Sequence, residues 1–293
     1  MILYMISTIQ DFFSCSDPNV RNVLLGTILL STSSAMIGAL ALLKRKTLIS
    51  DAIAHAVLPG SCFAFLLTGT KNSIWLIISA FITGWLASIA IDQITAHSKI
   101  KQDAAIAIVA SVAFGVGSFL LSILQHSVQA SQGGLKSFLL GSAATLLRED
   151  VVVLCCLSFI IIVVLALFFK AFVVIAFDRL FAQSIGLPVK KIQFLFTSLM
   201  VLAIVIGIRA VGVVLMSAML ITPATTARFW TANISYIMLF AMLIALFSSL
   251  VGTFISYIIP SMPTGPWIVL IMSLIAYFSF LIIWCGRICK KHR

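Results

Sequence analysis

The chain has 293 residues, of which 62% are hydrophobic and only 9% charged, and its mean hydropathy is +1.21. One water-soluble core cannot enclose so much apolar surface, so most of it must face lipid. The apolar runs are continuous, which excludes a transmembrane β-barrel because barrel strands alternate apolar and polar residues. We therefore expect an all-α, polytopic helical bundle in which residues 1–293 form a single transmembrane domain.

The predicted membrane helices follow one another along the chain as apolar runs near the ~20 residues that span a bilayer. Residues 192–227 are too long for one span and are interrupted by Arg209, so we expect two short helices that meet near that arginine. The bundle then has nine spans, or eight if this run is not split. The other runs lie at about 22–43, 48–69, 73–95, 103–124, 151–176, 234–259 and 267–286.

Two segments outside these runs are not expected to span. Residues 1–18 carry Asp11 and Asp17 and have no basic region before their apolar part, so they predict an interfacial helix rather than a cleavable signal. Residues 135–147 are apolar but shorter than a span, which is typical of a re-entrant or interfacial helix. Neither segment predicts a separate domain.

Residues 177–191, "FDRLFAQSIGLPVKK", separate the two groups of membrane helices. Phe181 and Ile185 recur at helical spacing, Gly186 follows as the expected C-cap, and Pro188 prevents further helix. The pattern predicts a short amphipathic helix on the cytoplasmic face. A simple connector between two spans fits the same pattern.

The distribution of lysine and arginine sets the predicted orientation, because cytoplasmic loops retain basic residues. With nine spans and a cytoplasmic C-terminus, the outer side receives only Arg21, Lys71, Lys136, Arg148 and Arg209. This retention, together with contact to anionic membrane lipid, accounts for the net charge of +11. We therefore expect no nucleic-acid partner.

Asp51 and His55 are conspicuous because few ionisable groups occur inside the predicted spans. At positions i and i+4 they share one helix face, about 6 Å apart along the axis. A carboxylate and an imidazole on one face suit Zn²⁺, Mn²⁺ or Fe²⁺, and two ligands alone would hold the ion weakly enough for passage. The pattern also allows Asp51 to be a helix-capping anion and His55 to be a structural histidine whose ring nitrogens are hydrogen-bonded within the fold.

Three stretches of the chain carry a family resemblance. They are "SDAIAHAVLPG" at 50–60, "FDRLFAQSIGLPV" at 177–189 and "RAVGVVLMSAMLITPATTAR" at 209–228. Together they resemble the membrane permease subunits of bacterial manganese, zinc and iron ABC importers, the metal ABC-3 permease family. The similarity extends over nearly the whole chain, and the sequence departs from the family pattern at Ala54, where serine is common.

The resemblance implies a permease subunit of the bacterial inner membrane that carries manganese, zinc or iron as cargo and holds no permanent cofactor. It implies that Asp51 and His55 line the metal path. It also implies partners: a cytoplasmic ATP-binding subunit, an extracytoplasmic metal-binding protein, and a second permease copy or a paralogue. The ATPase-coupling residues would be Asp178, Arg179, Phe181, Gly186 and Leu187.

We do not expect the chain itself to be an enzyme. It contains no G-x-x-x-x-G-K-[ST] phosphate loop, so a separate polypeptide must hydrolyse ATP. A stand-alone secondary carrier or channel is the alternative, and it would have no use for a docking helix. A membrane enzyme that uses Asp51 and His55 as acid and base would need further catalytic groups at membrane depth.

Overall fold

The computed structural model describes residues 18–44, 46–68, 73–126, 148–259 and 263–291. Within these ranges every regular element is a helix, which confirms the all-α prediction. The expected segments at 1–18, apart from Pro18, and at 135–147 lie outside the described residues. The helices are α2 (Pro18–Leu43), α3 (Thr47–Thr68), α4 (Ser73–His97), α5 (Gln102–His126), α7 (Arg148–Leu167), α8 (Phe169–Phe177), α9 (Arg179–Ser184), α10 (Val189–Val211), α11 (Val213–Trp230), α12 (Ile234–Ile258) and α13 (Thr264–Lys291).

Seven helices in the described part of the chain are long and apolar enough to cross a membrane: α2, α3, α4, α5, α10, α12 and α13. The helices α7 and α8 qualify only together, and the chain bends by 63° between them. The predicted span at 151–176 is therefore a broken helix, interrupted at Phe168. Counting this bent pair as one span gives eight, the lower of the two predicted numbers.

The long run at 192–227 divides into α10 and α11, as the sequence predicts, and the break lies at Gly212. Gly212 has a φ of +97°, a left-handed conformation that glycine adopts more readily than a residue with a Cβ. The 23 residues of α10 form a full span, whereas the 18-residue α11 is not among the candidate spans. The expectation of two short helices is therefore wrong for α10, and the described residues do not support a ninth span.

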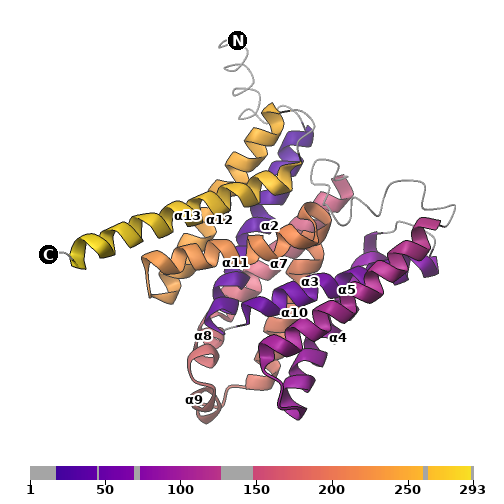
Figure 1. Cartoon of the computed structure of the whole chain (residues 1–293), viewed down its shortest axis with the longest axis horizontal. Coiled ribbons are helices and arrows are strands. Elements are labelled where there is room, and N and C mark those ends of the chain that lie inside the picture. The colour runs from indigo at the N-terminus through magenta and orange to yellow at the C-terminus, as the bar shows by residue number, and fades with distance from the viewer. Residues whose placement is uncertain (1–17, 45, 69–72, 127–147, 260–262, 292–293) are drawn as a thin grey trace.

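The centre of the bundle is formed by α2, α3, α10 and α11, which meet at small residues. Gly38 of α2 approaches the backbone of Leu220 in α11 so closely that a Cβ would overlap its carbonyl. Such contacts let membrane helices pack closely where lipid supplies no hydrophobic driving force. Figure 1 shows α4 and α5 on one side of this core, α13 on the other, and α8 and α9 at the end away from the start of α2.

Candidate functional site

Asp51 and His55 lie together on α3, one of the central helices. The Asp51 Oδ2 and His55 Nε2 atoms are 3.9 Å apart. This separation is too long for a hydrogen bond, but both atoms can reach one ion at metal–ligand distances of about 2.0–2.2 Å. The Asp51 side chain is 52% exposed and that of His55 26% exposed. The structure thus brings the two predicted ligands together and leaves them accessible.

The capping alternative does not hold for Asp51. Helix α3 begins at Thr47 and has no acidic residue in its first turn, so Asp51 lies too far inside the helix to cap it. His55 is held in place by its ring, which meets the Phe114 ring of α5 edge-on, with centroids 5.5 Å apart and an interplanar angle of 80°. Packing on one side and exposure on the other orient the imidazole without closing it off.

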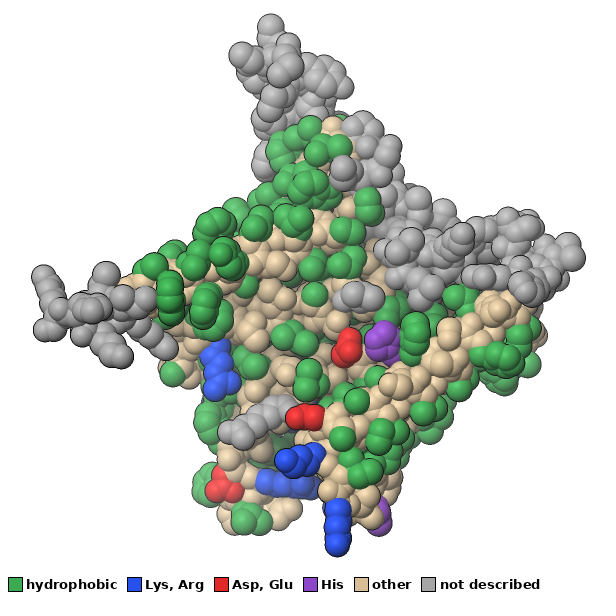
Figure 2. Space-filling model, viewed as in Figure 1, with side chains coloured by type: hydrophobic (Ala, Val, Ile, Leu, Met, Phe, Trp, Pro, Cys, Tyr) green, Lys and Arg blue, Asp and Glu red, His purple; other side chains and the backbone are tan. Residues whose placement is uncertain are grey.

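The pair belongs to a stripe of α3 that the other described residues leave uncovered. Thirteen residues of this helix are buried. The uncovered stripe runs through Leu48, Asp51, His55, Phe63 and Leu66, so its polar side chains are the two predicted ligands. On the face shown in Figure 2, acidic and histidine side chains are few among the hydrophobic ones.

One chain offers an incomplete set of ligands. Within the described residues, no group of three or more His, Cys, Asp or Glu side chains could hold a metal ion. Pro59 lies inside α3, and because proline has no N–H it cannot donate to the carbonyl of His55, four residues earlier. The helix therefore leaves a carbonyl oxygen of His55 without its usual partner beside the pair. The spacing of His55 and Pro59 carries this signal in the sequence.

The predicted surface helix exists as α9, and its two ends are fixed by specific hydrogen bonds. The Asp178 carboxylate accepts from the backbone N–H groups of Leu180 and Phe181, at 2.9 and 3.0 Å. At the other end Gly186 has a φ of +82°, as the predicted C-cap requires. Its N–H donates to the Gln183 carbonyl at 3.0 Å, and the next N–H donates to the Ala182 carbonyl at 3.1 Å, which is a Schellman motif.

The outer face of α9 is strongly apolar. Leu180 is 77% exposed, and Phe181 and Ile185 are each more than half exposed, whereas Ala182 is fully buried against the bundle. Arg179 is exposed beside them. Leu187, which the family resemblance also assigns to coupling, is instead partly buried and packs against the core. The exposed face therefore contains Arg179 and Phe181 but not Leu187.

Lys44 forms a buried cluster that sequence reasoning did not find. Its Nζ atom is buried without a hydrogen-bond partner among the described residues. It lies 4.1 Å from the ring centroid of Phe196 in α10 and 5.4 Å from that of Phe172 in α8. Burial, and then the nearby charge of Lys46, lower the pKa of Lys44 to about 8. The aromatic faces partly offset the loss of water around the ammonium.

Comparison with known proteins identifies the family. The model of the ABC 3 transport family matches residues 16–283. The chain belongs to the ABC 3 transport family. It is accordingly a multi-pass membrane protein of a transport family, which agrees with the fold and with the resemblance noted in its sequence.

Individual relatives of this ABC 3 protein come from several bacteria. The manganese transport system membrane protein MntC of Bacillus subtilis is 43% identical over 264 residues, covering 90% of this chain and 61% of the relative. The zinc transport system membrane protein TroC of Treponema pallidum is 39% identical over 267 residues, covering 91% and 90%. The solved structure "PsaBC from Streptococcus pneumoniae in complex with Fab" is 30% identical with a TM-score of 0.80, covering 96% of this chain and 95% of that one.

Proposed function

We propose that this ABC 3 protein is the membrane permease subunit of an importer for manganese, zinc or iron, with Asp51 and His55 as ligands along the metal path. The observation that carries the proposal is the accessible pair with Oδ2 and Nε2 3.9 Å apart on a central helix. Ionisable groups inside a membrane are costly and usually serve a substrate or ion path. The names of relatives, which specify manganese and zinc transport, support the same class of cargo.

The chemistry of the pair suits transient binding of these ions. A carboxylate oxygen and an imidazole nitrogen are ligands that Mn²⁺, Fe²⁺ and Zn²⁺ all accept. Two side chains hold an ion less tightly than a closed cage of four, and an ion that must leave on the far side needs such moderate binding. No resident cofactor is required for this role. The cargo ion itself is the only metal that the proposal involves.

A second permease copy, or a paralogue, would complete the site. The Asp51 carboxylate is half exposed in an isolated chain and lies about 6 Å along α3 from its start, so without a partner it would face the membrane near its interface. A partner related by two-fold symmetry would cover the uncovered stripe of α3 with the same stripe of its own. Two carboxylates and two imidazoles would then surround one central path. An extracytoplasmic metal-binding protein would deliver the ion to it.

The helix α9 is the proposed docking element for a cytoplasmic ATP-binding subunit. Its exposed apolar face, with Leu180, Phe181 and Ile185, would be unfavourable in water unless a partner covers it. On the face in view, lysine and arginine side chains lie mainly toward the end that carries α9 (Figures 1 and 2), as expected for the cytoplasmic side. Because the caps at Asp178 and Gly186 fix both ends, α9 can move as a rigid unit.

The Lys44 cluster is the proposed connection from α9 to the metal pair, Asp51 and His55. Phe172 lies in the helix that precedes α9, and Phe196 in the helix that follows it. Lys44 directly follows α2, and α3 begins three residues later. A displacement of α8 and α10 by the ATPase would therefore reach the start of α3 through the cation–aromatic contacts. This arrangement supports alternating access, in which the level of Asp51 is exposed to each side in turn.

The test is metal uptake by the whole complex reconstituted in vesicles, with radiolabelled manganese and zinc. Asp51→Asn keeps the size of the side chain and removes its charge, and Asp103→Asn is the matched control at another exposed aspartate. We expect uptake to collapse only in the Asp51 variant while assembly is preserved. Normal uptake by that variant would overturn the metal-path assignment. Uptake that continues without ATP hydrolysis would instead favour a stand-alone carrier or channel.

A further inference from the structure

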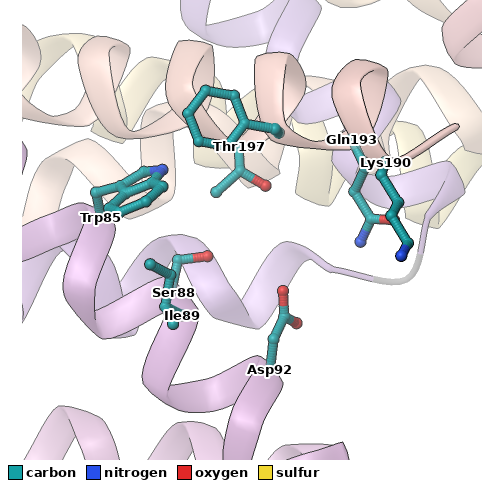
Figure 3. A pocket seen from close by; sticks show the side chains of 8 residues that line it. Trp85, Ser88, Ile89, Asp92, Lys190, Gln193 and Thr197 are labelled. Atoms are coloured by element: carbon teal, nitrogen blue, oxygen red, sulfur yellow. The ribbon is translucent and has the colours of Figure 1, made fainter. Parts of the chain in front are cut away.

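A cavity of about 210 Å³ lies between α4 and α10, apart from the Asp51 and His55 pair. Trp85 and Asp92 line it from α4, and Lys190, Gln193 and Phe194 line it from α10. Figure 3 shows the Asp92 carboxylate and the Lys190 ammonium turned toward the same gap, with Trp85 at its other end. The space is larger than a single ion or water molecule needs.

The lining changes from charged to aromatic along the helices. Lys190 is the second residue of α10, and Asp92 lies near the end of α4, so both charges lie near the membrane surface that carries α9. Trp85 lies seven residues before Asp92, about 10 Å deeper at the helical rise of ~1.5 Å per residue. There its ring meets the Phe194 ring edge-on, with centroids 5.4 Å apart. A phospholipid is built in the same order, with a charged head group at the membrane surface and apolar chains below it.

At the charged end of the cavity, the side chains favour a ligand with one negative charge. Lys46 Nζ lies 3.3 Å from Asp92 Oδ1, so this ion pair already offsets the Asp92 charge. In the described part of the chain, no carboxylate lies within ion-pair distance of Lys190, whose side chain is exposed. The three groups together carry a formal charge of +1. One phosphodiester carries the opposite charge, and Gln193 beside Lys190 supplies an amide N–H donor for it.

We propose that this cavity binds one phospholipid of the inner leaflet, with its phosphodiester on Lys190 and Gln193 and its first acyl carbons against Trp85 and Phe194. Basic pockets between transmembrane helices on the cytoplasmic side are a recurrent place for lipid head groups, and tryptophan is favoured where head group and chain meet. The bound lipid joins α4 to α10 across a gap that protein side chains leave unfilled. The site is independent of the metal pair, so either assignment can fail without the other.

Native mass spectrometry of the full-length permease in a mild detergent tests the site. The protein is stripped of lipid and titrated with phosphatidylglycerol. Lys190→Gln removes the proposed phosphate ligand, and Lys191→Gln is the matched control, because this neighbouring exposed lysine does not line the cavity. We expect retention of one lipid per chain in the wild type and in the Lys191 variant. The Lys190 variant should bind about fivefold more weakly, as the loss of one basic contact predicts.

A second variant and two competitors exclude other occupants. Trp85→Ala should also weaken lipid retention, because it removes the aromatic wall of the chain-binding end. Inorganic phosphate or glycerol phosphate in excess should not displace the lipid, since neither fills that end. Equal losses in the Lys190 and Lys191 variants would overturn the proposal in favour of non-specific surface lipid. Displacement by free phosphate, or a cross-link from a Phe194→Cys variant to a second copy, would overturn it as well.

Discussion

The proposed metal pair, Asp51 and His55, and the Lys44 cluster lie close together in sequence and present their charges in opposite ways. Asp51 and His55 stand on an uncovered stripe, partly exposed and not hydrogen-bonded to each other. Lys44, which precedes the same helix, is enclosed by the rings of Phe172 and Phe196, and its ammonium has no hydrogen-bond partner among the described residues. Two accessible ligands that are not bonded to each other can bind an ion and release it again. The enclosed Lys44 ammonium can only keep or break its contacts with the residues around it.

This difference separates two requirements of a transporter. A cargo site must bind and release, so its ligands need free coordination positions and moderate affinity. A mechanical connection must distinguish two states, so its contacts must be strong in one arrangement and lost in the other. Under the proposed function, Asp51 and His55 would meet the first requirement and Lys44 would meet the second.

The largest effect is expected at the metal pair. His55→Ala should reduce manganese and zinc uptake on the order of a hundredfold, because even the loss of a group that only supports a metal ligand costs 10–100-fold in affinity. The double variant with Asp51→Asn should be little worse than either single one, since residues that serve one site are not additive. Uptake kinetics with all three proteins measure this. If the double variant instead lost uptake by the product of the two single reductions, the residues would act separately.

Docking through α9 is the next largest effect. Phe181→Asp places a charge on the exposed apolar face, so co-purification with the ATP-binding subunit should be lost while the permease still inserts. Gln183→Asp is the control, because it adds the same charge at another exposed position of the same short helix. Pull-down from solubilised membranes measures both. Undiminished binding by the Phe181 variant would rule out the apolar face as the docking surface.

A smaller, selective effect is expected at Lys44. Lys44→Met should leave the fold as stable or more stable, because it removes a buried charge and keeps an unbranched chain of similar length. Metal transported per ATP hydrolysed should nevertheless fall by about fivefold to thirtyfold, in line with a cation–aromatic contact of ~1–2 kcal/mol. Lys44→Arg should retain most of the coupling, since a guanidinium also stacks on aromatic rings. Equal coupling in the Met and wild-type proteins would show that the cluster only packs.

The smallest effect concerns pH and stability. The pKa of Lys44 is lowered from 10.5 to about 8 in the fold, so between these values the unfolded chain binds the proton and the folded chain does not. The free energy of unfolding contributed by this group therefore rises with pH across that window. Relative to Lys44→Met, the wild type should gain a few degrees in Tm between about pH 7 and pH 9.5. A constant difference between their thermal unfolding curves would contradict the buried position of the ammonium.

Local sequence patterns predicted much of the fold and part of the candidate site. Apolar runs located the spanning helices, and the i, i+4 spacing placed Asp51 and His55 on one face, because both patterns act within one helix. The C-cap of α9 is likewise readable from Gly186, whereas the N-cap carboxylate of Asp178 is seen only in the structure. The break at Phe168 was missed, since "LFFK" contains neither glycine nor proline to announce it. The apolar run also predicts too short a helix for α10, because it begins at 192 and breaks near Arg209, whereas α10 extends from Val189 to Val211.

Hydropathy and spacing along the chain therefore determined that this protein is an all-α membrane bundle with a polar pair inside one span, because those properties depend only on neighbouring residues. The tertiary structure decided which faces stay open. It covered Leu187 while exposing Phe181, left one stripe of α3 uncovered, and brought two distant phenylalanines around Lys44. Burial, and with it the behaviour of each charge, arises from contacts between helices far apart in sequence, and no local pattern encodes those contacts.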